Sequence, residues 1–376
     1  MIRLILLIIL LLVSLLALFR APAYPLWLLS IVVTEFPLVF AAGTIIALVS
    51  GFCLSKYQLP GTITGLVALV LFLSPVFRSY LISRHLKTDL VQAFGQESLK
   101  NDIEPFSWGK LLKFSFKDTV GAKSLNYITY ADGAHLTLDF YPSQLPGKRP
   151  CIIVVHGGSW AGGDSRQLPD LNSYLAQKGY HVASINYRLA PKYKTPAPVE
   201  DIKHAMYYLR AHADEWHIDT TKFVLLGRSA GAQIAMLAAY TLHDPALKGV
   251  IEFYGPVDMV WGYSIPSNPL IMDSRKVMND YVGGSYAQVP QKYYDSSPLF
   301  FVDKNSPPTL MIHGINDPLV TYIHSIKLSA KLSENHIPYF WLKLPWATHG
   351  FDYNLHGPGG QLSTFTVEQF LNRVTK

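Results

Sequence analysis

Cysteine and charge are both scarce in this sequence. Its 376 residues include only two cysteines, Cys53 and Cys151, which lie far apart, so we expect no framework of disulfide bonds. Charged residues amount to 15%, and the formal charge of +6 is spread along the chain rather than gathered into a basic block. This argues against a nucleic-acid-binding protein, which needs clustered positive charge. Internal repeats and low-complexity tracts are also lacking.

Hydrophobic residues make up 49% of the chain, and the excess is concentrated at the N-terminus. Three apolar runs, at about residues 4–19, 36–54 and 61–77, each approach the length of a membrane-spanning helix. We therefore expect a transmembrane region over residues 1–80. Ala21, Pro22 and Ala23 leave an alternative open, in which the first run is a cleaved secretory signal, and Arg20, just before that site, argues against it. Two apolar runs would then remain, so either interpretation predicts attachment to a membrane lipid bilayer.

The charges that flank the three runs indicate an orientation for this multi-pass region. With three spans, one side carries Arg20, Arg78, Arg84 and Lys87, and the other carries Arg3 and Lys56. The positive-inside rule then favours a cytoplasmic location for the rest of the chain, and one span more or fewer reverses it. Residues 25–29 either start the second span early or lie at the membrane interface. Glu35, within Thr34 to Pro37, is interpreted as an interfacial break rather than a functional carboxylate in the membrane.

Beyond a connecting segment at 81–118, residues 119–376 alternate between strand and helix patterns. Continuous apolar or alternating runs predict strands, and helical spacing predicts the helices between them. The expected strands are 136–140, 151–155, 181–185, 222–226, 250–254, 309–312 and 339–344, and the expected helices are 198–216, 230–242 and 364–373. Such alternation predicts an α/β fold with a mainly parallel sheet covered on both faces. Residues 259–305 interrupt the alternation and are expected to form a cap over the site.

Gly227-Arg228-Ser229-Ala230-Gly231 matches the G-x-S-x-G motif between a predicted strand and a predicted helix. A serine at this turn is held on a sharp bend where bulky neighbours would clash, so glycines flank it. The start of the following helix also favours negative charge that develops nearby. The pattern therefore predicts Ser229 as a catalytic nucleophile.

A serine hydroxyl needs a base, and the base needs an orienting acid. In this kind of fold the chain order is serine, acid, histidine. Asp317 follows the strand at 309–312 and His349 follows the strand at 339–344, so both are expected at the carboxyl edge of the sheet. We predict that His349 is the base and Asp317 the acid. His313, His356 and Asp352 are competitors, and His313 is expected to pack under the acid loop.

A glycine turn, His156-Gly157-Gly158-Ser159-Trp160, ends the expected strand at 151–155. Small residues there allow backbone N–H groups to approach a substrate closely. The N–H groups of Gly157 and Gly158, with that of Ala230, are predicted to form an oxyanion hole, in which each donor typically contributes about 2.7–4 kcal/mol.

These motifs together resemble the hormone-sensitive-lipase-like branch of α/β-hydrolase esterases and lipases, including bacterial carboxylesterases. The resemblance covers about residue 120 to the end and also involves Asn186 to Pro191, Tyr254 to Asp258, Tyr281 to Gly284, Ser297 to Leu299 and His313 to Asp317. It implies hydrolysis of carboxylic esters without a metal or organic cofactor. It also carries the roles of nucleophile, acid and base onto Ser229, Asp317 and His349. Arg228 and Ser159 depart from the family's pattern and leave the acyl and alcohol preference open.

The sequence thus predicts a membrane-anchored serine hydrolase that forms an acyl-enzyme on Ser229. The expected substrate is a small-molecule or lipid acyl ester. An acyltransferase or a peptidase with the same triad is the first alternative. A non-enzymatic scaffold is the second, and the intact set of catalytic residues argues against it.

Overall fold

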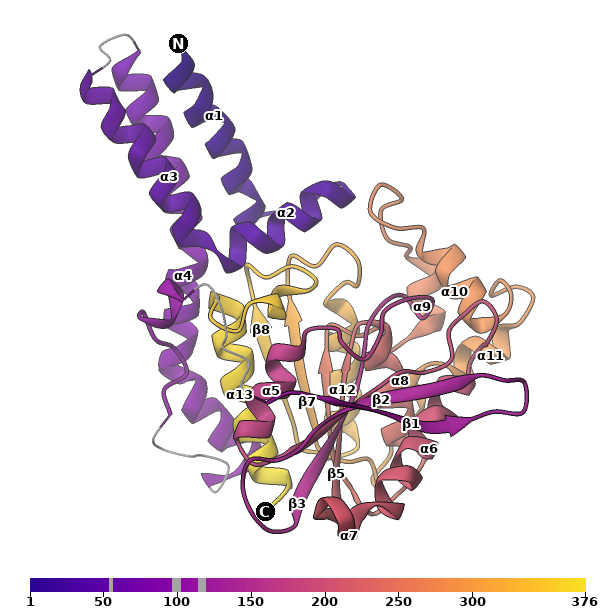
Figure 1. The fold of residues 1–376 in the computed structure, drawn as a ribbon. Helices are drawn as coiled ribbons and strands as arrows, with labels where there is room; N and C mark the ends of the chain where they lie inside the picture. The colour runs from indigo at the N-terminus through magenta and orange to yellow at the C-terminus, as the bar shows by residue number, and fades with distance from the viewer. Residues whose placement is uncertain (54–56, 97–102, 114–119) are drawn as a thin grey trace.

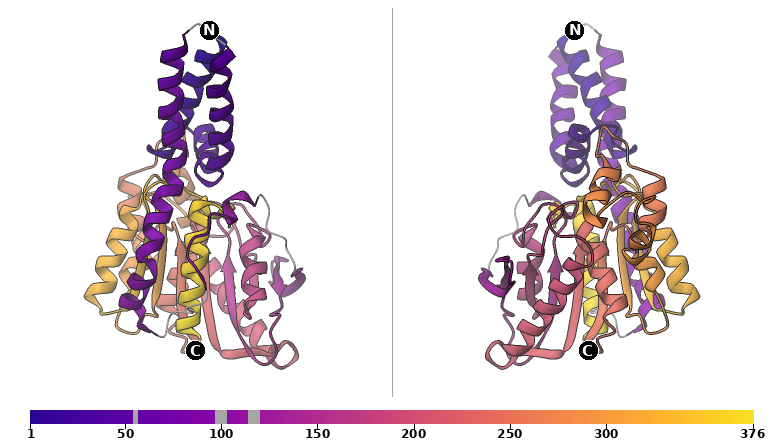
Figure 2. Two further views of the ribbon diagram at one scale, coloured as in Figure 1. Left: turned by 90° about the vertical axis from the view of Figure 1, so that its left-hand side faces the viewer. Right: turned by 90° about the vertical axis from the view of Figure 1, so that its right-hand side faces the viewer.

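The computed structural model describes residues 1–53, 57–96, 103–113 and 120–376. A bundle of N-terminal helices projects from a sheet domain, as Figure 1 shows, and the C-terminus lies at the far end of that domain. The side views in Figure 2 show the same projection from two further directions. The domain boundaries that the sequence indicated stay predictions.

One eight-stranded sheet forms the centre of the larger part, in the order β1-β2-β4-β3-β5-β6-β7-β8. The strands are β1 (Lys123–Thr129), β2 (His135–Tyr141), β3 (Arg149–Val155), β4 (His181–Ile185), β5 (Ile218–Arg228), β6 (Leu247–Phe253), β7 (Thr309–Gly314) and β8 (Tyr339–Leu344). The β1–β2 and β2–β4 pairs are antiparallel, and all the pairs from β4 to β8 are parallel. The predicted α/β fold with a mainly parallel sheet is confirmed.

Helices cover both faces of this sheet, because its strands are apolar on both sides. In β3, Cys151, Ile153 and Val155 join one core cluster, and Ile152 and Val154 join the other. The first cluster includes side chains of α6 (Ala197–Ala211), α8 (Ala230–Thr241) and α12 (Ile323–Glu334). The second includes side chains of α5 (Pro169–Gln177), α13 (Pro358–Val374) and the C-terminal half of α4 (Gln58–Phe94). This two-sided burial is the usual environment of parallel strands.

The segment that interrupts the alternation is helical and belongs to the first core cluster. It holds α9 (Met259–Ser264), α10 (Ser274–Val282) and α11 (Pro290–Asp295), followed by the short helix η5 (Pro298–Phe301). Met259, Met278 and Tyr293 are buried in the cluster, so these helices are fixed to the sheet domain. The expected helix at 198–216 is divided at His212 into α6 and α7 (Ala213–Trp216).

The N-terminal apolar runs form helices of unequal length. They are α1 (Ile2–Ser14) with η1 (Leu15–Ala17), α2 (Tyr24–Glu35), α3 (Pro37–Val49) with η2 (Ser50–Cys53), and α4. Within the described residues, α4 is the one helix that by itself is long and apolar enough to cross a membrane. The pair α2 and α3 passes the same test only when joined, and it is bent by 87°. Residues 54–56, with the end of the second run and Lys56, lie outside the described residues.

α4 does not stop where the apolar run ends. It is 37 residues long, and its last turns place Leu86, Leu90 and Phe94 in the core that α13 and the sheet share. The first part of the predicted connecting segment is therefore a continuation of α4 into the sheet domain. Residues 97–102 and 114–119 lie outside the described residues, and η4 (Lys110–Leu112) lies between them.

Candidate active site

Ser229 lies on the turn between the end of β5 and the start of α8. Its backbone angles are φ 54° and ψ −120°, a region that side-chain-bearing residues rarely adopt, and its N–H donates to the carbonyl oxygen of Phe253 at 2.9 Å. The side chain stays half-buried at the carboxyl edge of the sheet. A Cβ on Gly231 would lie 2.2 Å from the carbonyl oxygen of Val155, so the close approach of α8 to β3 requires glycine there.

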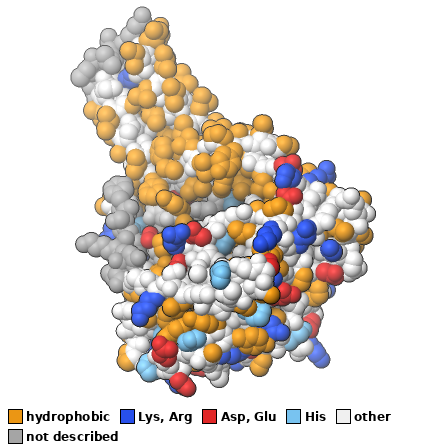
Figure 3. All heavy atoms as spheres, turned by 45° about the vertical axis from the view of Figure 1, so that its right-hand side comes forward, with side chains coloured by type: hydrophobic (Ala, Val, Ile, Leu, Met, Phe, Trp, Pro, Cys, Tyr) orange, Lys and Arg blue, Asp and Glu red, His pale blue; other side chains and the backbone are white. Residues whose placement is uncertain are grey.

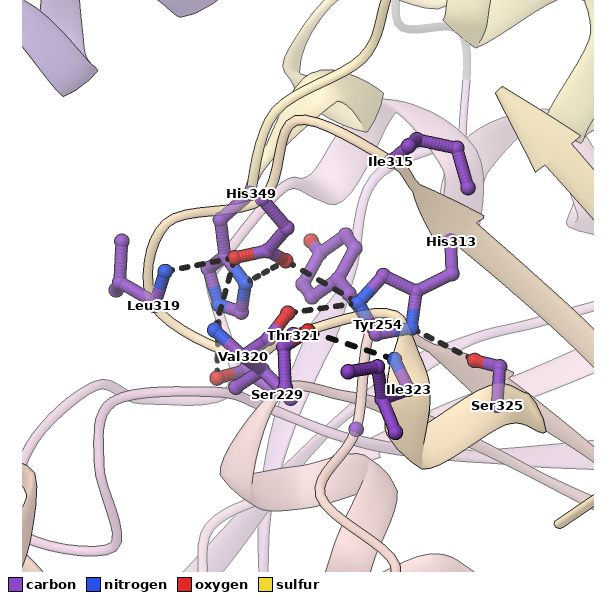
Figure 4. A network of polar contacts seen from close by, with 12 residues as sticks. Ser229, Tyr254, His313, Ile315, Leu319, Val320, Thr321, Ile323, Ser325 and His349 are labelled. Atoms are coloured by element: carbon purple, nitrogen blue, oxygen red, sulfur yellow. Dashed lines mark hydrogen bonds and ion pairs between the residues drawn. The ribbon is translucent and has the colours of Figure 1, made fainter. Parts of the chain in front are cut away.

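The structure brings Ser229, His349 and Asp317 together in one hydrogen-bonded series. Figure 4 shows Ser229 and His349 from close by, with the polar contacts around them. His349 Nε2 is 2.9 Å from Ser229 Oγ, and His349 Nδ1 is 2.6 Å from Asp317 Oδ2. The other carboxylate oxygen of Asp317 accepts the N–H groups of Leu319 and Val320 at 2.8 and 2.9 Å. All three side chains come from loops that follow parallel strands, as the sequence predicted from their positions.

Asp317 is buried between two histidines. Burial by itself would raise its pKa, but the charges and hydrogen bonds of His349 and His313 outweigh it and hold the pKa of this carboxyl well below its ordinary value. His313 Nε2 lies 3.4 Å from Asp317 Oδ2 and 2.9 Å from the carbonyl oxygen of Val320. Its Nδ1 lies 2.8 Å from Ser325 Oγ. Asp317 is therefore ionised and can stabilise positive charge on His349.

The competing residues lie elsewhere. His313 contacts the same oxygen of Asp317 as His349 does, and it packs under the loop that bears Asp317, where it contacts the carbonyl oxygen of Val320. His356 lies beyond the short helix η6 (Phe351–Tyr353), where its N–H donates to Asn354 Oδ1. Asp352 is buried and bound to Arg228 and Tyr254 rather than to His349.

Arg228, the residue before Ser229, forms a buried ion pair. Its Nε donates to Asp352 Oδ2 at 2.6 Å, and both side chains are at most 2% exposed. Tyr254 donates its hydroxyl proton to the other oxygen of Asp352 at 2.5 Å, and its ring lies 4.3 Å from the His349 ring. Arg228 thus contacts Asp352, and Tyr254, which also binds Asp352, packs against His349.

The glycine turn lies next to the nucleophile, but one of its N–H groups already has an acceptor. A Cβ on Gly157 would be 3.3 Å from Ser229 Cβ, while its N–H donates to Gln167 Oε1 at 2.7 Å. Gly158 has φ +124°, and a Cβ there would meet the carbonyl oxygen of Gly162 at 2.1 Å. Of the three predicted oxyanion donors, Gly158 and Ala230 therefore fit the role best, and Gly157 is engaged with Gln167.

A cavity of about 440 Å³ lies beside Asp317, between the acid loop and the cap. Its lining is mostly apolar and includes Trp160 from the glycine turn, Met272 and Met278 from the cap, and Leu319 and Val320 from the acid loop. Ser159 Oγ contacts the sulfur of Met272 at 3.5 Å, which joins the glycine turn to the cavity wall. The volume is in the range of pockets that hold small organic ligands.

The N-terminal segment also reaches this site, which the sequence did not indicate. Arg20 donates from Nε and Nη2 to the carbonyl oxygen of Ile315 in the acid loop, both at 3.3 Å. Trp27 Nε1 donates to the carbonyl oxygen of His349 at 3.0 Å. Arg20, Ala21 and Pro22 line the cavity. These contacts join residues about 300 positions apart, so no local pattern predicts them.

Glu35 ends α2 at the predicted break, but its carboxylate is buried in protein. Its oxygens accept the N–H of Gly359 at 3.0 and 3.3 Å and that of Gly360 at 3.3 Å, at the start of α13. Its carbonyl oxygen accepts Asn354 Nδ2 at 2.9 Å. The residue interpreted as an interfacial break therefore also satisfies free donors at a helix start.

Together, the sheet order and the array at its carboxyl edge define a protein of the α/β-hydrolase class. The BD-FAE family profile matches residues 138–332, and the chain belongs to that family. Across the residues that the structure describes, no group of three or more His, Cys, Asp or Glu side chains is placed to hold a metal ion.

Known relatives agree with this class. The chain is 28% identical over 273 residues to the probable carboxylic ester hydrolase LipM of Mycobacterium tuberculosis (strain ATCC 25618 / H37Rv), covering 69% of this chain and 62% of LipM. It is 28% identical over 171 residues to hormone-sensitive lipase of Mus musculus, covering 44% of this chain and 22% of the lipase. The chain thus spans less than two thirds of these relatives. A solved bacterial heroin esterase has a TM-score of 0.60 at 20% identity, covering 79% of this chain and 93% of the esterase. The resemblance to the α/β-hydrolase superfamily is confirmed.

Proposed function

We propose that the protein is a serine hydrolase that cleaves carboxylic esters through an acyl-enzyme on Ser229. The observation that carries this proposal is the hydrogen-bonded series from Ser229 Oγ through both nitrogens of His349 to the ionised Asp317. The unusual backbone angles of the half-buried Ser229 and its place next to the glycine turn support this role. The names of the relatives, which include carboxylic ester hydrolases, esterases and lipases, support an ester as the bond that is cleaved.

In the proposed cycle, His349 Nε2 takes the proton of Ser229 while the serine oxygen attacks the ester carbonyl carbon. The N–H groups of Gly158 and Ala230 stabilise the negative oxygen of the tetrahedral intermediate. The intermediate collapses, the C–O bond to the alcohol breaks, and His349 gives its proton to the leaving alcohol. Water then repeats the sequence on the acyl-enzyme and releases the acid. Asp317 stabilises the imidazolium at each stage.

The N-terminal helices are proposed to attach this domain to a membrane as a multi-pass region. The 37 residues of α4, with the apolar surfaces of α1 and α3 beside it, support this proposal. Arg78, Arg84 and Lys87 follow the apolar part of α4 and favour the cytoplasmic side for the catalytic domain. The domain limits of 1–80, 81–118 and 119–376 belong to the same proposal.

The test combines active-site labelling with ester hydrolysis by the full chain in detergent. Wild-type protein should react with a fluorophosphonate probe and hydrolyse a panel of esters of graded acyl length. Ser229→Ala should lose the labelling and reduce kcat by at least 10³-fold, as removal of a triad member does. Ser329→Ala, which removes a hydroxyl on α12, serves as the matched control. Labelling that persists in Ser229→Ala would overturn the assignment, and ester products with an added alcohol would indicate transfer instead of hydrolysis.

A further inference from the structure

Helix α2 is apolar on the side that is open to solvent. Trp27, Ser30 and Val33 face the protein, whereas Tyr24, Leu28 and Val32, spaced four residues apart, form a stripe that is 49%, 44% and 44% exposed. Glu35, at its C-terminal end, is the only charged residue of the helix. A helix on an aqueous surface normally carries a polar outer face. The composition of α2 therefore suits an apolar or interfacial environment.

Two independent contacts place α2 at the level where the apolar part of α4 ends. Glu35 of α2 binds the N–H of Gly359, and Ser79 of α4 donates to the carbonyl oxygen of Pro358, so both residues meet the start of α13. α4 carries no charge from Gln58 to Phe77, and Arg78 is its first charged residue. Those 20 residues (77 − 58 + 1) correspond to about 30 Å of helix, the thickness of a bilayer's hydrocarbon core.

The dimensions of α2 and α3 also place α2 at the level where the apolar part of α4 ends. α3 has 13 residues and a length of about 20 Å, and α2, turned by 87° from it, adds the diameter of one helix, about 10 Å. Together they match the same hydrocarbon thickness. Aromatic rings mark this level as well, since Trp108 contacts Phe77, Tyr80 and Phe106 at the end of the apolar part of α4. Aromatic side chains are enriched at membrane interfaces.

The cavity beside Asp317 is bordered at this level by residues 20–22, which directly precede α2, and by the cap loop 265–272. Tyr24 N–H donates to the carbonyl oxygen of Leu270 at 2.9 Å, and Asn268 Nδ2 donates to the carbonyl oxygen of Pro22 at 3.0 Å. Ile265 and Leu270 of this loop are 55% and 69% exposed. Figure 3 shows that apolar side chains cover the projecting helices and continue down to the body of the molecule, where charged side chains begin.

We infer that α2 and the cap loop 265–272 lie against the surface of a lipid bilayer, and that the cavity takes the acyl chain of an amphiphilic ester directly from that bilayer. The inference rests on the proposed ester hydrolysis and adds the source of the substrate. An ester held among lipids keeps its chain in an apolar environment during entry, because Ile265 lines the cavity and the exposed Leu270 belongs to the same loop, which meets the start of α2. Water-soluble short esters need no such path.

The first experiment compares two substrates on the full chain reconstituted in phosphatidylcholine vesicles. Leu28→Asp and Leu270→Asp should lower hydrolysis of a long-chain acylglycerol in the vesicles at least tenfold. They should leave hydrolysis of a water-soluble acetate ester within about twofold. Leu145→Asp, an exposed leucine before β3 at the opposite edge of the sheet, should change neither rate. Equal rates for wild type and the two rim variants on the acylglycerol would overturn the inference, as would equal losses on both substrates.

The second experiment reports on contact with lipid without any hydrolysis. A fluorophore on Leu28→Cys or Leu270→Cys, in a Cys53→Ser background, should be quenched at least twofold by brominated phosphatidylcholine. The same fluorophore on Leu145→Cys should be unaffected. Absence of quenching at both rim positions would refute the lipid contact even if the esterase is active. Quenching in a protein that hydrolyses no ester would leave the lipid contact standing and reject the proposed function.

Discussion

Around the nucleophile, Arg228 and Asp352 form an ion pair that is almost completely removed from water. Within the described residues, neither Nη atom of Arg228 has a hydrogen-bond partner, although both are buried. The Cζ atom of Arg228 lies over the Phe253 ring, 5.5 Å from its centre, and this cation–π contact offers partial compensation. The pair therefore fills buried space next to the turn that bears Ser229. The stability of the folded protein depends on the presence of both charges.

Loss of Asp352 alone should be far more damaging than loss of the pair. Asp352→Asn leaves the Arg228 charge buried without a counter-ion, which typically costs about 3–5 kcal/mol. Adding Arg228→Met removes the stranded charge, so the double variant should recover a large part of that loss. Urea unfolding in detergent of wild type, Asp352→Asn, Arg228→Met and the double variant gives the coupling energy between the two side chains. Losses that simply add in the double variant would contradict a buried pair.

At the scale of elements, sequence patterns predicted the strands and loops that are determined by nearby residues in the chain. The strands between residues 136 and 344 could be predicted from the sequence. The loops that bear Ser229, Asp317 and His349 could be placed together as well, because parallel strands bring their carboxyl ends to one edge. β1 was missed because it is an edge strand with mostly exposed residues. The polar second half of α4 was separated from its apolar first half, although one helix spans both. Glu252 lies within an expected buried strand, and a carboxyl group at such a position could have indicated a buried titratable residue.

The contacts between α2 and the sheet domain were beyond prediction, and Glu35 provides their clearest test. Its carboxylate is the acceptor for two N–H groups at the start of α13. Glu35→Ala should lower the free energy of unfolding by about 1–3 kcal/mol, because buried donors are left unsatisfied. Glu35→Gln, which keeps one acceptor oxygen, should lose less. Thermal unfolding in detergent measures both, with the exposed Glu334→Ala as control. An alanine variant as stable as wild type would show that water replaces the carboxylate.

Across the whole molecule, a buried polar series runs from the nucleophile to the far side of the acid loop. Ser229, His349 and Asp317 are followed by His313. Glu252 lies close enough to His313 for an electrostatic interaction between the two side chains. Burial would lower the pKa of His313, but the hydrogen bond and charge of Asp317 and the charge of Glu252 raise it. The protonation states of His313 and Glu252, at one end of the series, are thus linked to the stability of the catalytic domain.

Glu252 sets the direction of that link between pH 5 and 8. Burial raises its pKa to about 7 from an ordinary value of 4.5, against the opposing charge of His313 and the N–H of Gly255. A raised carboxyl pKa gives stability that is complete below about pH 4.5 and is lost as the pH rises through 7. The depressed pKa of Asp317 acts in the opposite sense, but its contribution is lost only at more acidic pH, below this window.

Glu252→Gln should therefore flatten the pH dependence of stability. Glutamine keeps the size and one acceptor for the Gly255 N–H, which Glu252 accepts at 2.8 Å, and carries no charge at any pH. Near pH 5 the variant should be about as stable as wild type. At pH 8 it should be more stable by up to roughly 3 kcal/mol, since 2.5 pKa units separate 4.5 from 7 and each is worth 1.36 kcal/mol. Urea unfolding across pH 5 to 8, with Glu334→Gln as the exposed control, measures the difference. If wild type and Glu252→Gln keep the same separation at every pH, Glu252 does not titrate in this window, because only a proton bound in the folded state produces a pH-dependent gap.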